Sequence, residues 1–236
     1  MTEGRKGRQT PTRSVVLPYT STLGGEAIEI YNSTGRTAQE WQELLISDIL
    51  AYNEDGLWIH TKYGYSVPRR NGKNEIVVIR ELIGLKQGEK ILHTAHRTTT
   101  THAAWERLLD LVEKAGMKVL SSYRAYGKEH IEIEGGGKIE FRTRTSKGGL
   151  GEGFDLLIID DLGTELTNSF VASQFFLCIN ERILRKQSTV ISTNLTLGSF
   201  MDTYSERVFS RVSSNYTMIK LIGKDIRIQK KILGGN

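Results

Sequence analysis

The sequence predicts an α/β fold in which a mainly parallel sheet is flanked by helices. From residue 90 onward, short apolar runs alternate with amphipathic segments of helical length, which is typical of strands joined by crossover helices. The run 156–159 is continuously apolar, as expected for a central strand buried on both faces. The chain has 236 residues, 38% of them hydrophobic and 25% charged, which is enough for a core in one large domain or two small ones.

Composition excludes several other classes of protein. The sequence contains no stretch of about eighteen apolar residues, so a membrane-spanning helix is not expected. The basic N-terminus has no apolar segment behind it, which argues against a secretory signal. Cys178 is the single cysteine, which excludes an internal disulfide framework. We therefore expect a cytoplasmic protein that has no membrane partner.

The first predicted helix follows an irregular segment. Residues 1–36 are rich in Gly, Thr and Ser and predict an irregular N-terminal arm. A helix should then begin near Thr37, because T-A-Q-E has the form of a capping box in which Glu40 reaches back to the first residue. The apolar residues of this helix recur at helical spacing and should share one face: Trp41, Leu44, Leu45 and Ile49.

The remaining elements follow in order along the chain. Short apolar runs at 57–59 and 65–67 precede a basic loop, and a second helix should then run from about residue 76 to Gly88. Hairpins are expected where glycines separate two alternating runs. The other predicted elements are strand 90–95, helix 101–115, a strand from Val119, hairpin strands 130–134 and 138–143, strand 156–159, helix 168–185, strand 189–193, a helix of roughly 197–212, and a closing β-hairpin of strands 217–222 and 225–229.

The loop S-V-P-R-R-N-G-K-N is the first candidate for chemistry. A phosphate site needs backbone amides at a helix N-terminus, a glycine and a lysine, and Gly72 and Lys73 supply the last two. The usual pattern has a first glycine where Val67 stands and a hydroxyl where Asn74 stands. Spacing alone therefore leaves a solvated basic turn open as the alternative.

Two acids follow the predicted central strand in L-L-I-I-D-D. The carboxyl end of a parallel strand is where ligands bind in open α/β sheets. Asp160 would hold magnesium, and Asp161 would orient or deprotonate an attacking water. The next buried strand ends in S-T-N, polar residues that could report on a γ-phosphate. The alternative for each strand is a polar turn without chemistry.

Arginines form the last group of candidates. Arg207 and Arg211 lie four residues apart on a predicted helix, and Arg227 lies on a late strand. Arginine suits the transition-state charge of phosphoryl transfer, although ordinary surface charge is the alternative. His93 and His96 lack supporting ligands for a metal, and Cys178 is expected in the core.

Residues from about 15 to 160 resemble the ATPase of phage terminase large subunits, which package DNA. The resemblance is carried by T-A-Q-E-W-Q-E-L-L, Y-S-V-P-R-R-N-G-K-N-E, I-L-H-T-A-H-R-T-T-T-T-H-A-A-W-E-R and R-T-R-T-S-K-G-G-L-G-E-G-F-D-L-L-I-I-D. It implies that Gln42, beside Trp41, reads adenine. It also implies that a degenerate phosphate loop binds the nucleotide through Arg69, Arg70, Asn71, Gly72, Lys73 and Asn74, with Asn74 a weak ligand for Mg²⁺.

From about residue 155 the chain is similar to DnaC/IstB-like AAA+ helicase loaders. The stretches that carry this similarity are D-L-L-I-I-D-D-L-G-T-E, N-S-F-V-A-S-Q-F-F, S-T-V-I-S-T-N-L-T-L, Y-S-E-R-V-F-S-R-V-S-S-N-Y and G-K-D-I-R-I-Q-K. The similarity implies that Asn194 is sensor 1, Arg207 the arginine finger and Arg227 sensor 2. The two resemblances meet at the strand that ends in Asp160.

Together these features predict a P-loop NTPase of the additional-strand (ASCE) type, with a single ATPase domain over residues 37–236 that is terminase-like over 37–160 and loader-like over 155–236. It would use ATP and Mg²⁺ and assemble as a homo-oligomeric ring or filament. Only 76 residues follow Asp160, so a terminase nuclease domain and DNA cleavage are not expected. Partners would be duplex DNA with a portal or small terminase, in the host cytoplasm if the protein is phage-encoded.

Two other functions remain open from the sequence. A helicase loader would instead use single-stranded DNA and a replicative helicase. A nucleotide- or DNA-binding module without turnover is also possible, because Asp161 stands where a glutamate is usual. Net charge does not choose between them: it is +3 over residues 1–13 and +6 over 180–236, which suits phosphate backbones or solvated termini equally.

Overall fold

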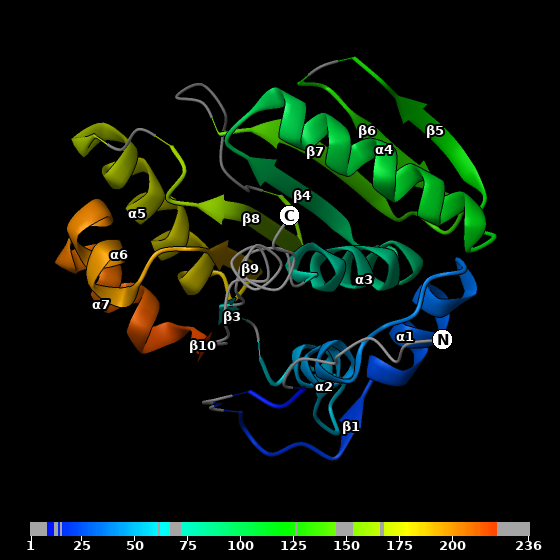
Figure 1. Ribbon diagram of the computed structural model, residues 1–236, viewed down its shortest axis with the longest axis horizontal. Coiled ribbons are helices and arrows are strands. Elements are labelled where there is room, and N and C mark those ends of the chain that lie inside the picture. Colours follow the sequence, from blue (N-terminus) through cyan, green and yellow to red (C-terminus); the bar gives the residue numbers. More distant parts are fainter. Residues whose placement is uncertain are drawn as a thin grey trace, which may run out of the picture.

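The computed structural model describes residues 9–11, 14, 16–60, 62–66, 72–125, 127–144, 153–165 and 168–220. An eight-stranded sheet runs through the molecule in the order β10-β3-β9-β8-β4-β7-β6-β5 (Figure 1). No helix among the described residues is long and apolar enough to cross a bilayer. The strands of this sheet are β3 (Lys62–Ser66), β4 (Lys90–Ala95), β5 (Val119–Tyr123), β6 (His130–Ile133), β7 (Lys138–Thr143), β8 (Leu156–Leu162), β9 (Ser188–Thr193) and β10 (Thr217–Lys220).

The sheet is mainly parallel, as the sequence predicts. Every neighbouring pair from β10 to β7 is parallel, and β6 pairs antiparallel with both β7 and β5. The hairpin predicted around the three glycines at 135–137 is therefore confirmed as β6 and β7. β10 is the first strand of the predicted C-terminal hairpin and pairs parallel with β3, whereas strand 225–229 lies outside the described residues.

Helices cover both faces of this sheet (Figure 1). α3 and α4 pack on one face, and α1 and α2 lie against α3; α5, α6 and α7 pack on the other face. A small antiparallel pair is formed by β1 (Ser21–Thr22), just before α1, and β2 (Ala51–Tyr52), just after α2. The helices are α1 (Gly24–Ser33), α2 (Glu40–Ile49), α3 (Lys73–Lys86), α4 (Thr98–Lys114), α5 (Ser169–Leu184), α6 (Leu197–Tyr204) and α7 (Glu206–Asn215).

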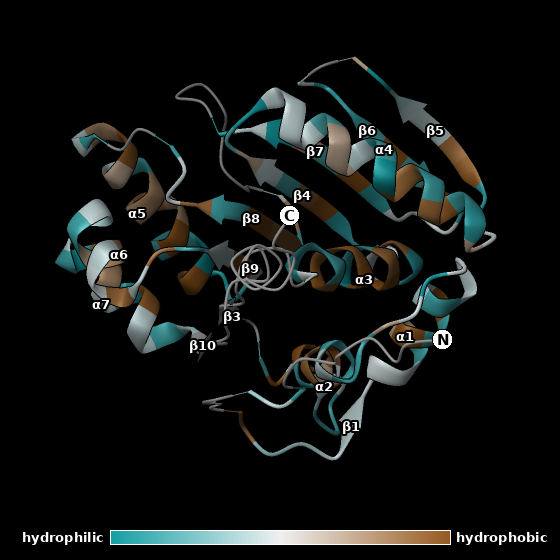
Figure 2. Cartoon of the chain, in the orientation of Figure 1, coloured by the Kyte–Doolittle hydropathy of each residue, from teal (hydrophilic) through white to brown (hydrophobic). Residues whose placement is uncertain are grey.

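The central strand β8 contributes to two separate apolar cores. Leu156 and Ile158 belong to the core beneath α3 and α4, whereas Leu157 and Ile159 belong to the core beneath α5 to α7. Successive side chains of a strand point to opposite faces, so a strand with both faces covered must be apolar throughout. Figure 2 shows hydrophobic residues concentrated on α3 and on the central strands. The same alternation directs Asp160, two residues after Ile158, toward the α3 side.

The expectation of an irregular arm over residues 1–36 is wrong for its second half. α1 occupies Gly24–Ser33, with Ala27 and Tyr31 buried in the core against α2 and α3. A Cβ added to Gly24 would lie 2.6 Å from the Cα of Ser47, so the two helices approach closely there. Leu23, Ala27 and Tyr31 recur at i, i+4 and i+8, and this spacing was the available sequence signal for the helix.

The next helix begins later than the sequence predicts. α2 starts at Glu40, not near Thr37, and its capping box is formed by Gln39 and Gln42, not by Thr37 and Glu40. Glutamine side chains can supply the same acceptors as the usual capping residues, and here tertiary contacts of Gln42 favour that choice. Leu44, expected on the buried face, is 48% exposed.

The helix predicted over 197–212 is two helices. α6 ends at Tyr204 and α7 begins at Glu206, with Ser205 between them at φ 81° and ψ 157°. A non-glycine residue rarely adopts this conformation, so the break is imposed by packing and not by local preference. Phe200 and Tyr204 on α6, and Val208 and Val212 on α7, all reach the same core because the chain turns between them.

Arg182 on α5 fixes this helix to the amino-terminal ends of β8 and β9. Its side chain is 1% exposed and donates hydrogen bonds to the Thr189 hydroxyl at 2.9 Å, the Phe154 carbonyl at 3.2 Å and the Ser188 carbonyl at 2.5 Å. Burial lowers the pKa of this guanidinium. A buried carbonyl that loses its hydrogen-bond donor destabilises the folded state, so Arg182 is important for stability.

We predict that Arg182→Met lowers the free energy of unfolding by about 2–4 kcal/mol, since methionine retains the apolar stem but leaves buried acceptors unpaired. Urea unfolding followed by circular dichroism measures the change. Arg185→Met on the same helix is the matched control, because the Arg185 side chain is 55% exposed in an i, i+4 pair with Glu181 and should cost less than about 0.5 kcal/mol. Equal losses in the two variants would contradict the assignment.

Candidate nucleotide site

The N-terminus of α3 faces the carboxyl ends of β8 and β9. Gly72 precedes α3 in the left-handed conformation at φ 79°, and a Cβ there would lie 2.9 Å from Gln42 Nε2. The backbone angle favours glycine at this position, and a larger residue would also displace the Gln42 side chain. Lys73 is the first residue of α3, as a phosphate-binding lysine at a helix N-terminus should be.

The Lys73 ammonium contacts three side chains at the carboxyl ends of β8 and β9. Its ammonium contacts Asp161 Oδ1 closely, donates to Ser192 Oγ at 3.2 Å and lies 3.5 Å from Asp160 Oδ1. The lysine side chain is 11% exposed. Three residues predicted separately from two motifs, Lys73, Asp160 and Asp161, therefore form one cluster.

Asp160 is a buried, ionised carboxylate. Burial by itself would raise the pKa of this carboxyl, but the charges of Lys73 and His93 and the hydrogen bond from Ser192 outweigh burial, and the pKa lies below its ordinary value. Removing water strengthens the attraction between Asp160 and a facing cation. The sheet thus presents a negative charge at the position where the sequence predicts a metal ligand.

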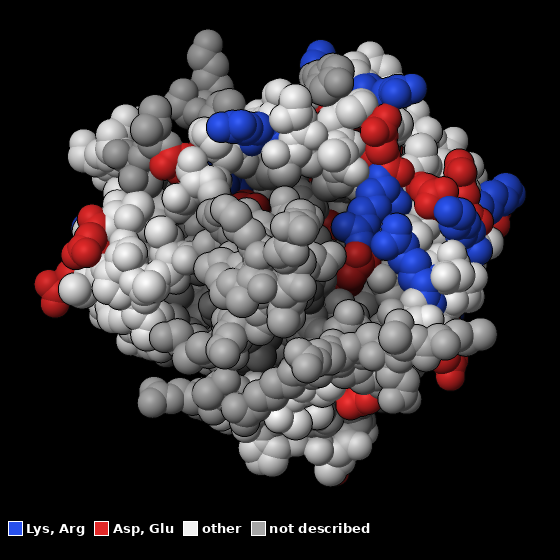
Figure 3. All heavy atoms as spheres, in the orientation of Figure 1, with Lys and Arg blue, Asp and Glu red and all other residues white. Residues whose placement is uncertain are grey.

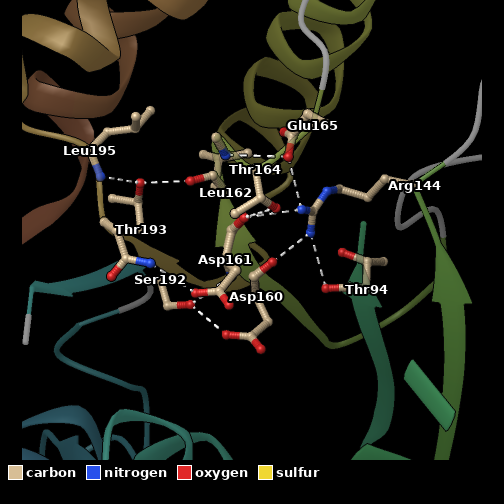
Figure 4. A network of polar contacts seen from close by, with 12 residues as sticks. Thr94, Arg144, Asp160, Asp161, Leu162, Thr164, Glu165, Ser192, Thr193 and Leu195 are labelled. Atoms are coloured by element: carbon tan, nitrogen blue, oxygen red, sulfur yellow. Dashed lines mark hydrogen bonds and ion pairs between the residues drawn. The ribbon is translucent and has the colours of Figure 1, made fainter. Parts of the chain in front are cut away.

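Ser192 on β9 is a site residue that sequence reasoning did not single out. Its hydroxyl donates to Asp160 Oδ1 at 2.6 Å and accepts from the Asp161 amide at 3.0 Å (Figure 4). It also accepts from the Lys73 ammonium. One donor and two acceptor positions are the full capacity of a serine hydroxyl. The available signal was the strand S-T-V-I-S-T, whose alternation directs Ser192 to the same face as Val190 and therefore toward α3.

Asp161 stands at an irregular point of β8. Its φ is 49°, and the register between β8 and β9 shifts between Ile159 and Leu162. The strand bends there, so Asp161 remains in the cluster when strict alternation would direct its side chain to the opposite face from Asp160. Asn194 follows β9, is exposed, and donates to Asp161 Oδ1 at 3.4 Å. The predicted residue Asn194 therefore lies beside the acids.

Gln42 links α2 to Gly72. The Gln42 side chain is 2% exposed; its oxygen accepts from the Gln39 amide at 2.8 Å and its nitrogen donates to the Gly72 carbonyl at 3.1 Å. Each end of an amide keeps a second hydrogen-bonding position. Adenine recognition by Gln42 stays a prediction, and the observed contact connects Gln42 to the residue that precedes Lys73.

Neighbouring side chains hold the first turn of α3 in place. The Tyr65 hydroxyl on β3 donates to the Lys73 carbonyl at 3.1 Å. Glu75 accepts from the Tyr31 hydroxyl at 2.6 Å and pairs with Arg107 and Arg36. Figure 3 shows basic and acidic side chains interspersed on the face that carries α3 and α4. Arg36 and Arg107 are paired with an acid there, and the described part of that face is not uniformly basic.

Arg144 supports the acids from behind. Its guanidinium donates to the carbonyls of Thr94 at 3.2 Å, Asp160 at 2.8 Å and Asp161 at 3.4 Å, and to the Glu165 carboxylate at 3.1 Å (Figure 4). No sequence motif marked Arg144 or Glu165 as site residues. Arg144 contacts the main chain of distant segments, and Glu165 contacts the distant side chains of Arg144 and Tyr204, which a local pattern does not reveal.

A buried pair lies below the cluster. Glu81 on α3 and His93 on β4 are bonded at 2.5 Å, so His93 has an acidic partner that sequence reasoning did not assign to it. Burial raises the pKa of Glu81 despite the opposing effect of His93. Burial would lower the pKa of His93, but the Glu81 charge and hydrogen bond raise it overall.

Other predicted residues lie apart from this cluster or outside the described structure. Arg207 is exposed on α7, where its guanidinium carbon stacks 4.0 Å from the ring centroid of Phe176 on α5. Arg211 is exposed on the same helix, and Asn74 is exposed in the first turn of α3. Cys178 is buried as predicted. Outside the described residues lie Arg69, Arg70, Asn71 and Arg227.

The cluster fits a magnesium–nucleotide complex better than a metal alone. Asp160 and Asp161 carry two negative charges against one from Lys73, so a cation is favoured near the acids. No group of three or more His, Cys, Asp or Glu side chains in the described residues could hold a metal by itself. Mg²⁺ is commonly bound through one or two carboxylates, with water and substrate phosphates as its other ligands.

Phage large terminases are among the solved structures with a similar fold. A variant of the large terminase ATPase domain from a Thermus phage aligns with a TM-score of 0.56 and 11% identity, over 87% of this chain and 89% of that chain. The HK97 bacteriophage large terminase aligns with a TM-score of 0.52 and 15% identity, over 73% of this chain. This chain covers 38% of the HK97 protein. No protein-family model matches the sequence, and no curated protein matches it.

The DnaC helicase loader, which the second half of the sequence resembles, is also among the structural neighbours. It aligns over 66% of this chain with 15% identity and a TM-score of 0.31. The terminase alignment over 87% of the chain extends well past residue 160, where the terminase-like sequence ends. The chain therefore shares the fold of the terminase ATPase domain, with a mainly parallel sheet between two helical layers.

We predict that the Glu81–His93 pair makes stability depend on pH. Because the folded-state pKa of His93 is raised, its contribution is fully present below the ordinary value of about 6.5 and is lost as the pH rises through the folded-state pKa. Glu81 contributes in the same direction: because its folded-state pKa is raised as well, its contribution to stability is also lost as the pH rises. Urea unfolding at a series of pH values should show wild-type stability falling above neutral pH more steeply than that of Glu81→Gln/His93→Asn. Parallel slopes would contradict the prediction.

Proposed function

We propose that this protein is a Mg²⁺-dependent ATPase that acts on DNA, most similar in function to the ATPase of a phage terminase large subunit. The observation that carries the proposal is the meeting of Lys73 with Asp160, Asp161 and Ser192 at the carboxyl ends of two parallel strands. Phosphoryl transfer needs charged groups placed around the phosphates, and this cluster supplies a positive ammonium and two negative carboxylates. The P-loop ATPase fold is the expected scaffold for such a site.

The roles of the residues follow from their positions. Lys73, at the start of α3, binds the nucleotide phosphates with the help of the helix amides. Asp160 would hold Mg²⁺, which would supply positive charge to the phosphate oxygens. Asp161 orients or deprotonates the attacking water. Its contact with Lys73 is replaced by a contact with this water when Lys73 binds the phosphates. Asn194, bonded to Asp161, senses the terminal phosphate.

Arg207 is proposed to act on a neighbouring subunit. The Arg207 side chain is exposed and stacks on Phe176 of α5. An arginine presented at the surface can complete a second subunit's site, which suits a ring or filament. Gln42 is proposed to contact adenine through the hydrogen-bonding positions that its contacts with Gln39 and Gly72 leave over.

We predict that Lys73→Ala lowers the rate of ATP hydrolysis by at least about 100-fold, because it removes a preorganised cation from the phosphates. Steady-state phosphate release measures the rate, and circular dichroism checks that the fold is retained. Lys86→Ala is the matched control: Lys86 ends the same helix, is half exposed and pairs with Glu26. Full activity of the Lys73→Ala protein would overturn the assignment.

The same assay with added DNA tests the proposed substrate. Stimulation of Lys73-dependent hydrolysis by duplex DNA is expected for a packaging motor. Stimulation by single-stranded DNA alone would favour a helicase loader. Nucleotide binding without phosphate release under any condition would identify a binding module without turnover.

We predict that Ser192→Ala slows hydrolysis by about 10- to 100-fold, since Lys73, Asp160 and the Asp161 amide lose a shared partner. The rate constant should fall more than nucleotide affinity, because the serine orients the acids and is not proposed to touch ATP. Thr189→Ser, on the same strand, retains the hydroxyl that Arg182 contacts and should remain close to the wild-type rate. Equal rates for Ser192→Ala and wild type would remove Ser192 from the mechanism.

A further inference from the structure

A buried network of three side chains extends from the nucleotide site to the corner between α6 and α7. Arg144 donates to Glu165 at 3.1 Å, and Glu165 accepts in addition from the Gly163 amide at 3.3 Å and from the Tyr204 hydroxyl. Figure 4 shows the Arg144 guanidinium facing Thr94, Asp160, Asp161 and Glu165. We refer to Arg144, Glu165 and Tyr204 as the Arg144 network.

One end of the Arg144 network is at the acids. The guanidinium is bonded to the main-chain carbonyls of both Asp160 and Asp161, the two residues proposed to hold magnesium and water. It therefore holds the main chain that orients their carboxylates. Any movement of the Asp160–Asp161 peptide must move Arg144 or break these bonds.

The other end is at the α6–α7 corner. Tyr204 is the last residue of α6 and is fully buried. Ser205 follows it as the single residue between the two helices, and Arg207 lies in the first turn of α7. A shift of the Tyr204 hydroxyl is therefore a shift of the corner from which α7 and Arg207 project.

Each end of the network coincides with a strained backbone position. Among the described residues, non-glycine positive φ angles occur at Asp161, Lys186 and Ser205, so two of the three flank this network. Ser205, at φ 81° and ψ 157°, lies in a region that essentially only glycine occupies freely. Such conformations persist only where surrounding contacts impose them, and they commonly mark segments that switch between two arrangements.

The charges of the network are buried and paired. The Arg144 and Glu165 side chains are 10% and 9% exposed. Burial would raise the pKa of Glu165, but Arg144 and the Tyr204 hydroxyl outweigh it, and the pKa is lowered. A buried pair that loses one partner leaves a costly uncompensated charge, so the network moves as a unit more readily than it separates.

We infer that the Arg144 network couples the nucleotide state of the Asp160–Asp161 segment to the orientation of the α6–α7 corner, with Glu165 as its central positioning residue. The inference rests on the proposed function, because it takes phosphate binding at Lys73 as the event that releases Asp161. When Asp161 exchanges Lys73 for water, its carbonyl shifts against Arg144, and Glu165 and Tyr204 carry that shift to Ser205. Arg207 then changes position in step with nucleotide binding.

Hydrogen exchange measured with and without Mg²⁺ and a non-hydrolysable ATP analogue tests the coupling. In the wild-type chain the analogue is expected to slow exchange in segment 72–86 and to change it in segment 197–215. Tyr204→Phe removes one hydroxyl from the network and should keep the first response while losing most of the second. Glu165→Gln should do the same. Thr203→Ala is the matched control, because the Thr203 hydroxyl donates to the Ser199 carbonyl within α6.

The outcomes separate the inference from the proposed function. If the analogue does not slow hydrogen exchange in segment 72–86 of the wild-type chain, nucleotide binding is overturned and the coupling with it. A 72–86 response without any change at 197–215, or a 197–215 response that survives Tyr204→Phe, would overturn the coupling alone. As a second readout, Tyr204→Phe should lower kcat by about 3- to 10-fold with KM for ATP unchanged, whereas a purely structural role would lower the melting temperature and leave kcat per folded molecule unaltered.

Discussion

The contact of the Lys73 ammonium with Asp160, Asp161 and Ser192 constrains most of this molecule. It requires α3 to begin directly opposite the ends of β8 and β9, although these segments are far apart in the chain. A carboxylate as buried as Asp160 is costly unless a cation and hydrogen bonds compensate it. The register of the central strands and the entry of α3 are therefore fixed together, and a change in one would leave a buried charge without its partner.

Several unusual local features follow from that constraint. The left-handed Gly72 lets the chain enter α3 beside Gln42, and the irregularity at Asp161 brings a second carboxylate to the same side of the sheet as the first. The Ser192 hydroxyl then uses its full hydrogen-bonding capacity, donating to Asp160 and accepting from Lys73 and the Asp161 amide. The N-terminal segment belongs to this construction too, since Tyr31 and Gln42 contact the first turn of α3 and the glycine before it.

Much of the fold could be predicted from the sequence, because its elements depend on local patterns. The apolar run ending in Asp160, the alternation around the glycines at 135–137 and the spacing of the helices after residue 90 identify strands and helices to within a few residues. Errors occurred where tertiary contacts outweighed a local signal. Packing of Ala27 and Tyr31 makes a helix of a Gly-rich segment, and Ser205 breaks a helix that sequence alone would continue.

The α/β alternation and the residue types of the site, a lysine after glycine and two acids after a buried strand, could be recognised in the sequence. These are properties of neighbouring residues, and they can be recognised without knowledge of the rest of the chain. The distant groups that support the site became visible in the folded chain. Ser192, Arg144 and the Glu81–His93 pair act through contacts made across strands and helices, and such contacts exist only once the sheet order and register are set.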